Sequence, residues 1–171
     1  MTRFRESEPP MAEPLGYFIT WSTYGTWLPG DERGWVEYRR GWQLPAPMRE
    51  LESMAKMTED ACRLDRVQRE LVHRQIAETC QVRGWELFTV NCRSNHAHVV
   101  LAASGDPKLV RSQLKAWCTR RLKELEISRC DGGVPIRENW WAERGSQRYI
   151  NDETSLEAAI LYVRDGQDKP R

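Results

Sequence analysis

The stretch WELFTVNCRSNHAHVVLAA, residues 85–103, decides the fold of this chain. Apolar and β-branched residues recur in two runs, 85–92 and 96–103, and the short polar segment RSN separates them. Runs of this length and composition are typical of β-strands. Two strands joined by so short a turn predict an antiparallel hairpin.

Two of the three histidines of the chain, His96 and His98, lie in this hairpin. Residues i and i+2 of a strand project from the same face, so the two imidazoles point together, while Ala97 and Val99 point the opposite way into a core. Two imidazoles on one rigid strand make half of a metal site. The third histidine, His73, lies in a charged helical stretch and is expected at the surface.

Patterns on either side of the hairpin predict further elements. Apolar residues recur at helical spacing in three segments, and two other segments are rich in β-branched and aromatic residues. The order β-α-β-β-α-β-α predicts an α+β fold, a ferredoxin-like antiparallel sheet with helices packed on one face. The predicted strands are 16–24, 85–92, 96–103 and one within 140–150, and the predicted helices are 58–84, 107–126 and 153–163.

Capping residues locate the ends of the helices. Thr58 is expected to cap the first helix and Gly84 to end it. Asp106 followed by Pro107 starts the second helix. Residues 25–47 are rich in Gly, Pro, Trp and Arg and are expected to form an ordered loop, because their tryptophans need packing partners.

The composition limits the class of protein. A chain of 171 residues fits one domain, expected over 16–171, after a flexible tail over 1–15. The net charge of +1 does not indicate a nucleic-acid partner, so such a claim rests on local patches. Five cysteines without a CxxC pair argue against a disulfide framework and a zinc ribbon. The sequence shows neither a signal peptide nor an apolar run of membrane length, so a cytoplasmic location is expected.

The carboxyl-terminal segment offers partners for the two histidines. Tyr162 lies on the last predicted helix and is followed by Asp165 and Gln167. A phenol and a metal-ligating side chain on one short helix suit phosphoryl transfer, in which a metal polarises a phosphate oxygen and the tyrosine attacks phosphorus. Tyr149 is a rival nucleophile, although its surroundings favour packing or base stacking.

Three segments of the chain resemble the single-tyrosine transposases of the HUH superfamily, and more narrowly the REP-associated tyrosine transposase-like branch. The resemblance covers residues 16–167 and combines a His-hydrophobic-His triplet, a Trp-Trp segment and a tyrosine on a final helix. The segments are YFITWSTYGTWLPGD (17–31), SNHAHVVL (94–101) and WWAERGSQRYINDETSLEAAILYV (140–163).

The resemblance implies a DNA transposase-like endonuclease and strand transferase. Tyr162 would cleave single-stranded, hairpin-bearing DNA and hold it through a covalent 5′-phosphotyrosine bond. His96 and His98 would lie on a central strand and bind one Mg²⁺ or Mn²⁺. The resemblance also implies a homodimer that acts on two DNA ends.

The chain departs from the family pattern at two places. The third metal ligand of the family is usually a polar residue four positions after the tyrosine, where this chain has Gly166. Gln167 is therefore the preferred third ligand, with Asp165 as the alternative. The family's Met-Pro-Asn before the triplet is Arg-Ser-Asn here, so only Asn95 is shared.

Basic and aromatic residues interleave in two parts of the chain, a combination suited to the phosphates and unstacked bases of single-stranded DNA. Further cations on the second predicted helix either hold backbone phosphates or form a solvated face. The predicted DNA-binding residues are Arg137, Trp140, Trp141, Arg144 and Arg148, with Lys108, Arg111 and Lys115 of the helix; Arg33, Arg39 and Arg40 around Trp35, Tyr38 and Trp42 look similar.

Other functions remain open from the sequence. A non-catalytic or domesticated relative would keep the fold and bind DNA hairpins without cleaving them. An unrelated zinc hydrolase would use His96 and His98, but the sequence offers it no natural set of further ligands. In the simplest alternatives the histidines are polar residues of an exposed sheet face and Tyr162 packs in a core.

Overall fold

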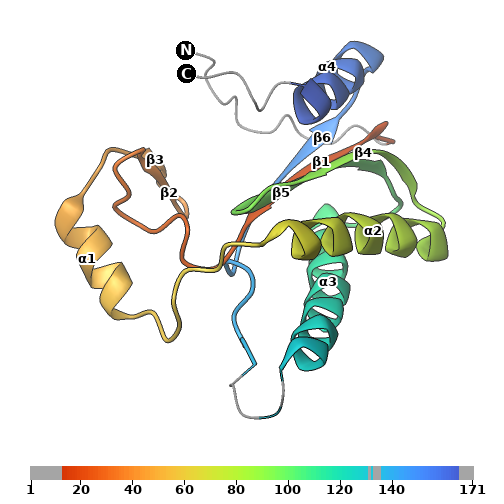
Figure 1. Cartoon of the computed structure of the whole chain (residues 1–171). Helices are drawn as coiled ribbons and strands as arrows, with labels where there is room; N and C mark the ends of the chain where they lie inside the picture. Colours follow the sequence, from red (N-terminus) through yellow and green to blue (C-terminus); the bar gives the residue numbers. More distant parts are fainter. Residues whose placement is uncertain (1–12, 131, 133–135, 166–171) are drawn as a thin grey trace.

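The computed structural model describes residues 13–130, 132 and 136–165, so most of the expected tail, 1–12, lies outside the described range. Its centre is a four-stranded sheet in the order β4-β5-β1-β6, in which every neighbouring pair is antiparallel (Figure 1). This order is that of a split β-α-β sheet and confirms the predicted ferredoxin-like α+β fold. The strands are β1 (Gly16–Ser22), β4 (Glu86–Cys92), β5 (His96–Ala102) and β6 (Ser146–Ile150).

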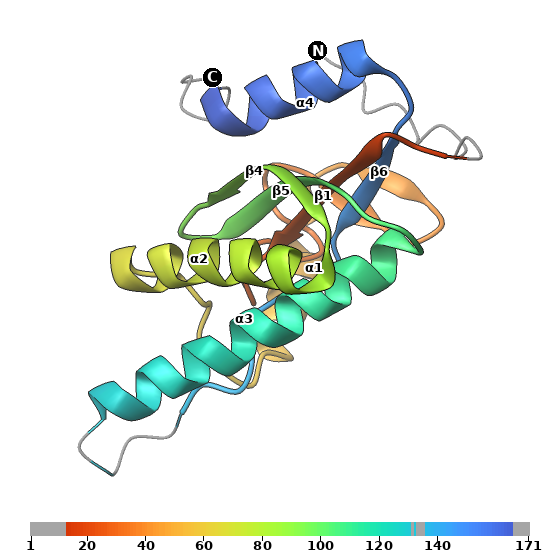
Figure 2. The same cartoon turned by 90° about the vertical axis from the view of Figure 1, so that its right-hand side faces the viewer.

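Helices lie on both faces of the sheet. As expected, α2 (Arg66–Arg83) and α3 (Pro107–Arg129) pack together on one face. The last helix, α4 (Glu153–Asp165), lies on the opposite face, where it contacts β4, β5 and β6 (Figure 2). The expectation that all helices share one face therefore does not hold for α4. None of the helices in the described part of the chain is long and apolar enough to span a bilayer.

The sequence of β5 explains the two helical layers. Val99 and Leu101 belong to the core beneath α2 and α3, and Val100 belongs to a second core beneath α4. All three side chains are fully buried. Because neighbouring residues of a strand point to opposite faces, consecutive buried apolar residues require a covering layer on each side. Ala159 and Val163 of α4 complete the second core.

The start of α2 differs from the prediction. The helix is capped by Asp65, whose side chain accepts a hydrogen bond from the Gln68 backbone, while the Gln68 side chain accepts one from the Asp65 backbone. This capping box satisfies the backbone N–H groups of both Asp65 and Gln68. Thr58 does not cap the helix. The Thr58 backbone instead donates to the hydroxyl of Tyr24. The predicted end at Gly84 and the predicted start of α3 at Asp106 are confirmed.

The predicted loop after β1 contains regular structure. It forms a small antiparallel ribbon of β2 (Trp35–Glu37) and β3 (Gly41–Gln43), and then α1 (Pro47–Ala55) begins. Trp35 is buried, and the Trp27 indole donates a hydrogen bond to the Gly34 carbonyl. This packing explains why the segment is ordered. Figure 1 shows the ribbon and α1 standing beyond the end of the sheet at which β1 finishes.

The cap of α2 generates a stability prediction. Asp65 also accepts a hydrogen bond from Arg129 at 2.8 Å, and this contact lowers the pKa of the carboxyl group. Asp65→Ala removes both the cap and the ion pair and should lower the free energy of unfolding by about 1–2 kcal/mol. Asp65→Asn keeps the capping oxygen and should cost less. Urea unfolding measures both losses, and equal losses would contradict the capping role.

Candidate metal and nucleophile site

The two histidines of β5 lie side by side, as predicted. Their ring centroids are 4.6 Å apart, and the planes are nearly perpendicular at 73°. His98 is 8% exposed and His96 is half-buried. On the neighbouring strand β1 they pair with Thr20 and Ser22. The face that they share is the one covered by α4, because Val100, two residues beyond His98, packs against that helix.

Each imidazole is oriented by a neighbouring oxygen. The Nδ1 atom of His96 lies 2.6 Å from Oδ1 of Asn95, which can only accept, so Nδ1 carries the proton. Nδ1 of His98 lies 2.6 Å from the hydroxyl oxygen of Thr20. Because Nδ1 is engaged in both rings, Nε2 is the nitrogen through which either imidazole would bind a metal ion, and oriented imidazoles are typical of metal-binding histidines. Asn95 is also the residue that the chain shares with the family pattern.

Burial keeps His98 neutral. Loss of solvent, together with the nearby His96 and Arg93, lowers the pKa of His98 from 6.5 to about 3. A neutral imidazole is the form that binds a metal ion, so this environment favours ligation.

Tyr162 reaches the histidines from α4. Its ring centroid is 5.9 Å from that of His98 and 5.9 Å from that of Phe18. Phe18 in turn lies 5.6 Å from His98, so the three rings form one cluster. Tyr162 is still 47% exposed, so part of the residue is accessible to solvent. The rival Tyr149 packs against Tyr17 in the core on the opposite face of the sheet.

Sequence reasoning missed a contact that holds α4 over the site. The side-chain amide of Asn91 on β4 donates a hydrogen bond of 3.0 Å to the carbonyl of Val163, the residue after Tyr162. Asn91 is the cross-strand partner of His98 and shares its face. Asparagine is disfavoured inside strands, so its position within the run ELFTVNC was the available signal.

The third metal ligand stays a prediction. Gln167 lies outside the described residues. Asp165 is exposed, and its carboxylate forms an ion pair of 2.8 Å with Arg164, which lowers its pKa. Within residues 13–130, 132 and 136–165, no group of three or more His, Cys, Asp or Glu side chains is arranged to hold a metal ion. The histidines and Asp165 therefore do not form such a group in this structure.

One predicted DNA-binding cation lies beside the site. Arg148 on β6 pairs with Phe18 of β1, and its guanidinium carbon lies 5.6 Å from the Phe18 ring centroid. Because Phe18 contacts both His98 and Tyr162, Arg148 is on the same face as these residues. The Arg148 side chain is exposed and can meet a phosphate there.

The prediction that Trp140 stacks on DNA bases is wrong. Trp140 is 3% exposed and belongs to the main core, and its indole donates to the Arg137 carbonyl. A buried ring cannot offer its face to a base. Trp141 is partly buried, stands edge-on to Trp21 and donates to the hydroxyl of Thr119.

Three other predicted DNA-binding cations make contacts within the protein. Arg137 donates to the Asp60 carbonyl at 2.9 Å. Lys115 donates to the Ala142 carbonyl at 2.6 Å, and burial lowers the pKa of its ammonium group to about 8. Arg111 donates to the side chain of Gln147, and burial lowers its pKa. Arg111 and Lys115 thus fasten the segment around β6 to α3, on the face away from Tyr162, while Lys108 is exposed.

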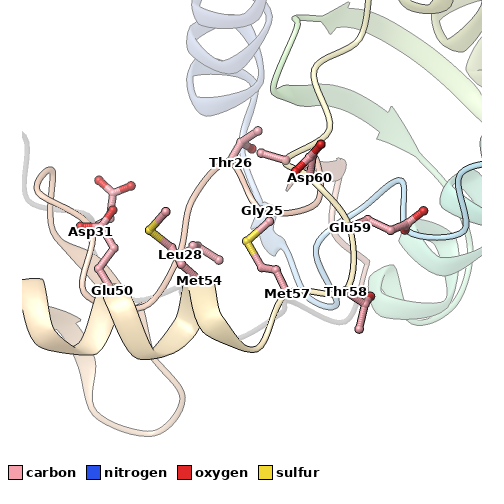
Figure 3. A pocket seen from close by; sticks show the side chains of 11 residues that line it. Gly25, Thr26, Leu28, Asp31, Glu50, Met54, Met57, Thr58, Glu59 and Asp60 are labelled. Carbon is pink, nitrogen blue, oxygen red and sulfur yellow. The ribbon is translucent and has the colours of Figure 1, made fainter.

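The structure also contains a pocket of about 620 Å³, and Figure 3 shows the side chains that line it. It is bounded by the segment after β1 and by the end of α1 with the chain that follows, and none of its lining residues belongs to the ring cluster. Four of the lining residues are acidic, and one of them, Asp31, forms an ion pair with Arg33. The acidic residues are Asp31, Glu50, Glu59 and Asp60.

Comparison with solved structures identifies the class of fold. A REP-associated tyrosine transposase bound to a REP hairpin has a TM-score of 0.50 and 12% sequence identity, over 92% of this chain and 69% of that chain. A candidate transposase from Deinococcus radiodurans R1 has a TM-score of 0.43 and 16% identity, over 96% of this chain and 99% of that chain. No protein-family model and no curated protein matches the sequence. The chain shares the fold of the REP-associated tyrosine transposase, which confirms the predicted resemblance at the level of the fold.

The buried imidazole generates a pH prediction. Between pH 6.5 and about 3 the unfolded chain protonates His98 and the folded chain does not, so the unfolding free energy falls as the pH falls. The titration of His98 changes the free energy of unfolding by up to about 1.4 kcal/mol per pH unit. His98→Asn should therefore show a shallower loss of stability between pH 7 and pH 5. Urea unfolding in EDTA measures both proteins, and parallel pH profiles would contradict the neutral imidazole.

Proposed function

We propose that this protein cleaves and rejoins single-stranded DNA, with Tyr162 as the nucleophile. The observation that supports this most is the contact between Tyr162 on α4 and His98 on β5, which joins a phenol to an imidazole pair across two distant parts of the sequence. Packing alone does not require a half-exposed tyrosine at this position. A nucleophile must remain accessible to its substrate, as the 47% exposure of Tyr162 allows.

DNA is the substrate that the surroundings favour. The REP-associated transposase that shares the fold is bound to a REP hairpin. In this chain Arg148 supplies a cation beside the ring cluster, where the phosphodiester would lie. Single-stranded or hairpin-bearing DNA suits an open site better than duplex, because an unpaired strand can bend its backbone toward the phenol.

The proposed reaction conserves the phosphodiester energy. The Tyr162 oxygen attacks phosphorus, the bond from phosphorus to the 3′-oxygen breaks, and a 5′-phosphotyrosine forms. The phenolic proton passes to solvent, and the leaving 3′-oxygen takes up a proton to become a free hydroxyl. In the reverse step a 3′-hydroxyl attacks the phosphotyrosine, which restores the phosphodiester and the phenol. Strand transfer follows without ATP when that hydroxyl belongs to another DNA end.

A divalent cation, Mg²⁺ or Mn²⁺, completes the proposal. His96 and His98 would bind it through Nε2, and the contacts of Asn95 and Thr20 with Nδ1 fit this role. Gln167 is the proposed third ligand, with Asp165 as the alternative. When bound, the cation would polarise a phosphate oxygen and offset the charge that develops at phosphorus. We also propose a homodimer, because strand transfer brings two DNA ends together.

The central prediction is a covalent adduct that depends on Tyr162. Incubation of the protein with a foldback oligonucleotide and Mn²⁺ should yield a protein–DNA species that survives denaturing electrophoresis. Tyr162→Phe should abolish this species, because the nucleophilic oxygen is missing. His96→Ala with His98→Ala should lower its yield by at least about a hundredfold, since these residues hold the cation.

Tyr149→Phe is the matched control, because Tyr149 lies on the opposite face and should leave the yield of adduct unchanged. If both the parent protein and Tyr162→Phe bind DNA but neither forms an adduct, the protein is the non-catalytic DNA-binding relative instead. Tightly bound zinc without DNA affinity would favour the unrelated hydrolase.

The Asn91 contact generates a second prediction. Asn91→Ala removes the hydrogen bond to the Val163 carbonyl and should let the end of α4 move relative to the histidines. A small displacement of a nucleophile lowers the rate by about 10- to 100-fold. The rate of adduct formation should therefore fall while the affinity for DNA stays the same. An unchanged rate would show that packing of Val163 alone positions Tyr162.

A further inference from the structure

We propose that the β2–β3 ribbon, with Arg144, binds the unpaired DNA strand beside the cleaved phosphodiester. We call this surface the arm. The proposal rests on the proposed function, because it assumes that single-stranded DNA reaches Tyr162. It assigns a DNA contact to a part of the chain that is separate from the ring cluster. The arm consists of Val36, Tyr38, Arg39, Arg40, Trp42 and Arg144.

The arm exposes large apolar side chains on two very short strands and on the turn between them. Tyr38 is 66% exposed, Val36 is 59% exposed and Trp42 is 55% exposed. Val36 and Trp42 are cross-strand partners, so their side chains lie next to each other. A ribbon with three residues in each strand has almost no core of its own. Grouped apolar side chains of this kind indicate a surface that another molecule covers.

The arm is held in one conformation. The Trp42 ring packs closely over Gly34, where a Cβ atom would overlap it and where φ is 82°. Trp27 stands 6.4 Å from Trp42, and its indole donates to the Gly34 carbonyl. Arg39 in the turn has a φ of 68°, a conformation that few non-glycine residues adopt. An aromatic surface that is already ordered loses little conformational entropy when it binds a ligand.

Two guanidinium groups lie over the Tyr38 ring of the arm. The Arg144 guanidinium carbon lies 4.2 Å from the Tyr38 ring centroid, and that of Arg39 lies at 5.3 Å. The third cation, Arg40, forms a 3.5 Å ion pair with Glu37. Aromatic faces beside guanidinium groups match the bases and phosphates of a single strand. A duplex buries the faces of its bases, so its stem would not use the exposed Trp42 ring.

The arm is linked to the ring cluster along β6. Arg144 precedes Ser146, the first residue of β6, and Ser146 pairs with Thr20, whose hydroxyl contacts His98. Two residues of extended chain span at most about 7 Å, so the backbone of Arg144 lies close to the paired residues Ser146 and Thr20. Arg148 continues the line of cations to Phe18. A strand that leaves Tyr162 along this edge meets Arg148 first and the arm next.

A binding experiment tests the arm without cleavage. The full chain carrying Tyr162→Phe is titrated, in EDTA, against a fluorescent foldback oligonucleotide with a single-stranded extension and against the same foldback with a blunt end. Trp42→Ala and Tyr38→Ala should each weaken binding of the extended form by about 5- to 100-fold, the loss of one stacked base. Binding of the blunt form should stay unchanged. Arg144→Gln should lower the salt dependence of binding by the equivalent of one phosphate contact.

Leu44→Ala is the matched control, because Leu44 is 80% exposed just after β3 and offers no aromatic face. It should bind both oligonucleotides like the parent, and Trp42→Phe should recover most of the affinity lost in Trp42→Ala. Equal affinity of the alanine variants and the parent for the extended form would overturn the proposal. Equal losses of affinity for the extended and the blunt oligonucleotide would also overturn it, and so would a parent protein that binds neither. A change of oligomeric state in Trp42→Ala without DNA would overturn it as well, because Trp42 would then contact a second copy of the chain. If Trp42→Ala weakens DNA binding but the parent protein forms no covalent adduct with DNA, the nuclease proposal is contradicted. The arm would still be a DNA contact in that case.

Discussion

Burial of β5 on both faces is the constraint on which the rest of the structure depends. Val99 and Leu101 require the layer of α2 and α3, and Val100 requires a second layer on the other side. That second layer is α4, which packs Val163 against Val100. Tyr162, the neighbour of Val163 in sequence, lies on an exposed part of the same helix. Packing of a central strand thereby brings a phenol to the imidazole pair.

The candidate site combines a dry interior with an open edge. His98 is desolvated between Thr20, Phe18 and Tyr162, and its low pKa follows from that burial. His96, nearer the start of the strand, is half-buried and oriented by Asn95. A ligand that binds both imidazoles would therefore meet one rigid donor and one donor closer to solvent. The pocket beyond β1 differs from this site, because four of its lining residues are acidic and none is a histidine.

Five of the predicted DNA-binding cations divide into two groups. Arg111, Arg137 and Lys115 use their donors on carbonyl or amide oxygens and hold the segment before and within β6 to the rest of the fold. Arg144 and Arg148 are exposed and lie over aromatic rings. The net charge of +1 does not distinguish these two groups. Binding of a nucleic acid depends on the cations that remain accessible at the surface. Arg148 lies beside the ring cluster and Arg144 beside Tyr38 of the arm, while Lys108 is exposed on α3.

Local rules explain what could be predicted from the sequence. Alternation along 85–103 predicts the hairpin and places both histidines on one face, and Asp106 before Pro107 predicts the start of α3. The same rules failed at Thr58, where a local signal lost to the capping box of Asp65 and Gln68.

The sequence by itself therefore determined the order of the four strands of the central sheet and of the three helices that pack on it, and the direction in which His96 and His98 project. Only the tertiary structure decided that α4 covers the histidine face, that Asn91 holds its end, and that Trp140 lies in the core. These features depend on contacts between residues far apart in the chain. Periodicity within one element shows which of its faces is apolar, but the volume and shape of the neighbouring elements decide what packs against that face.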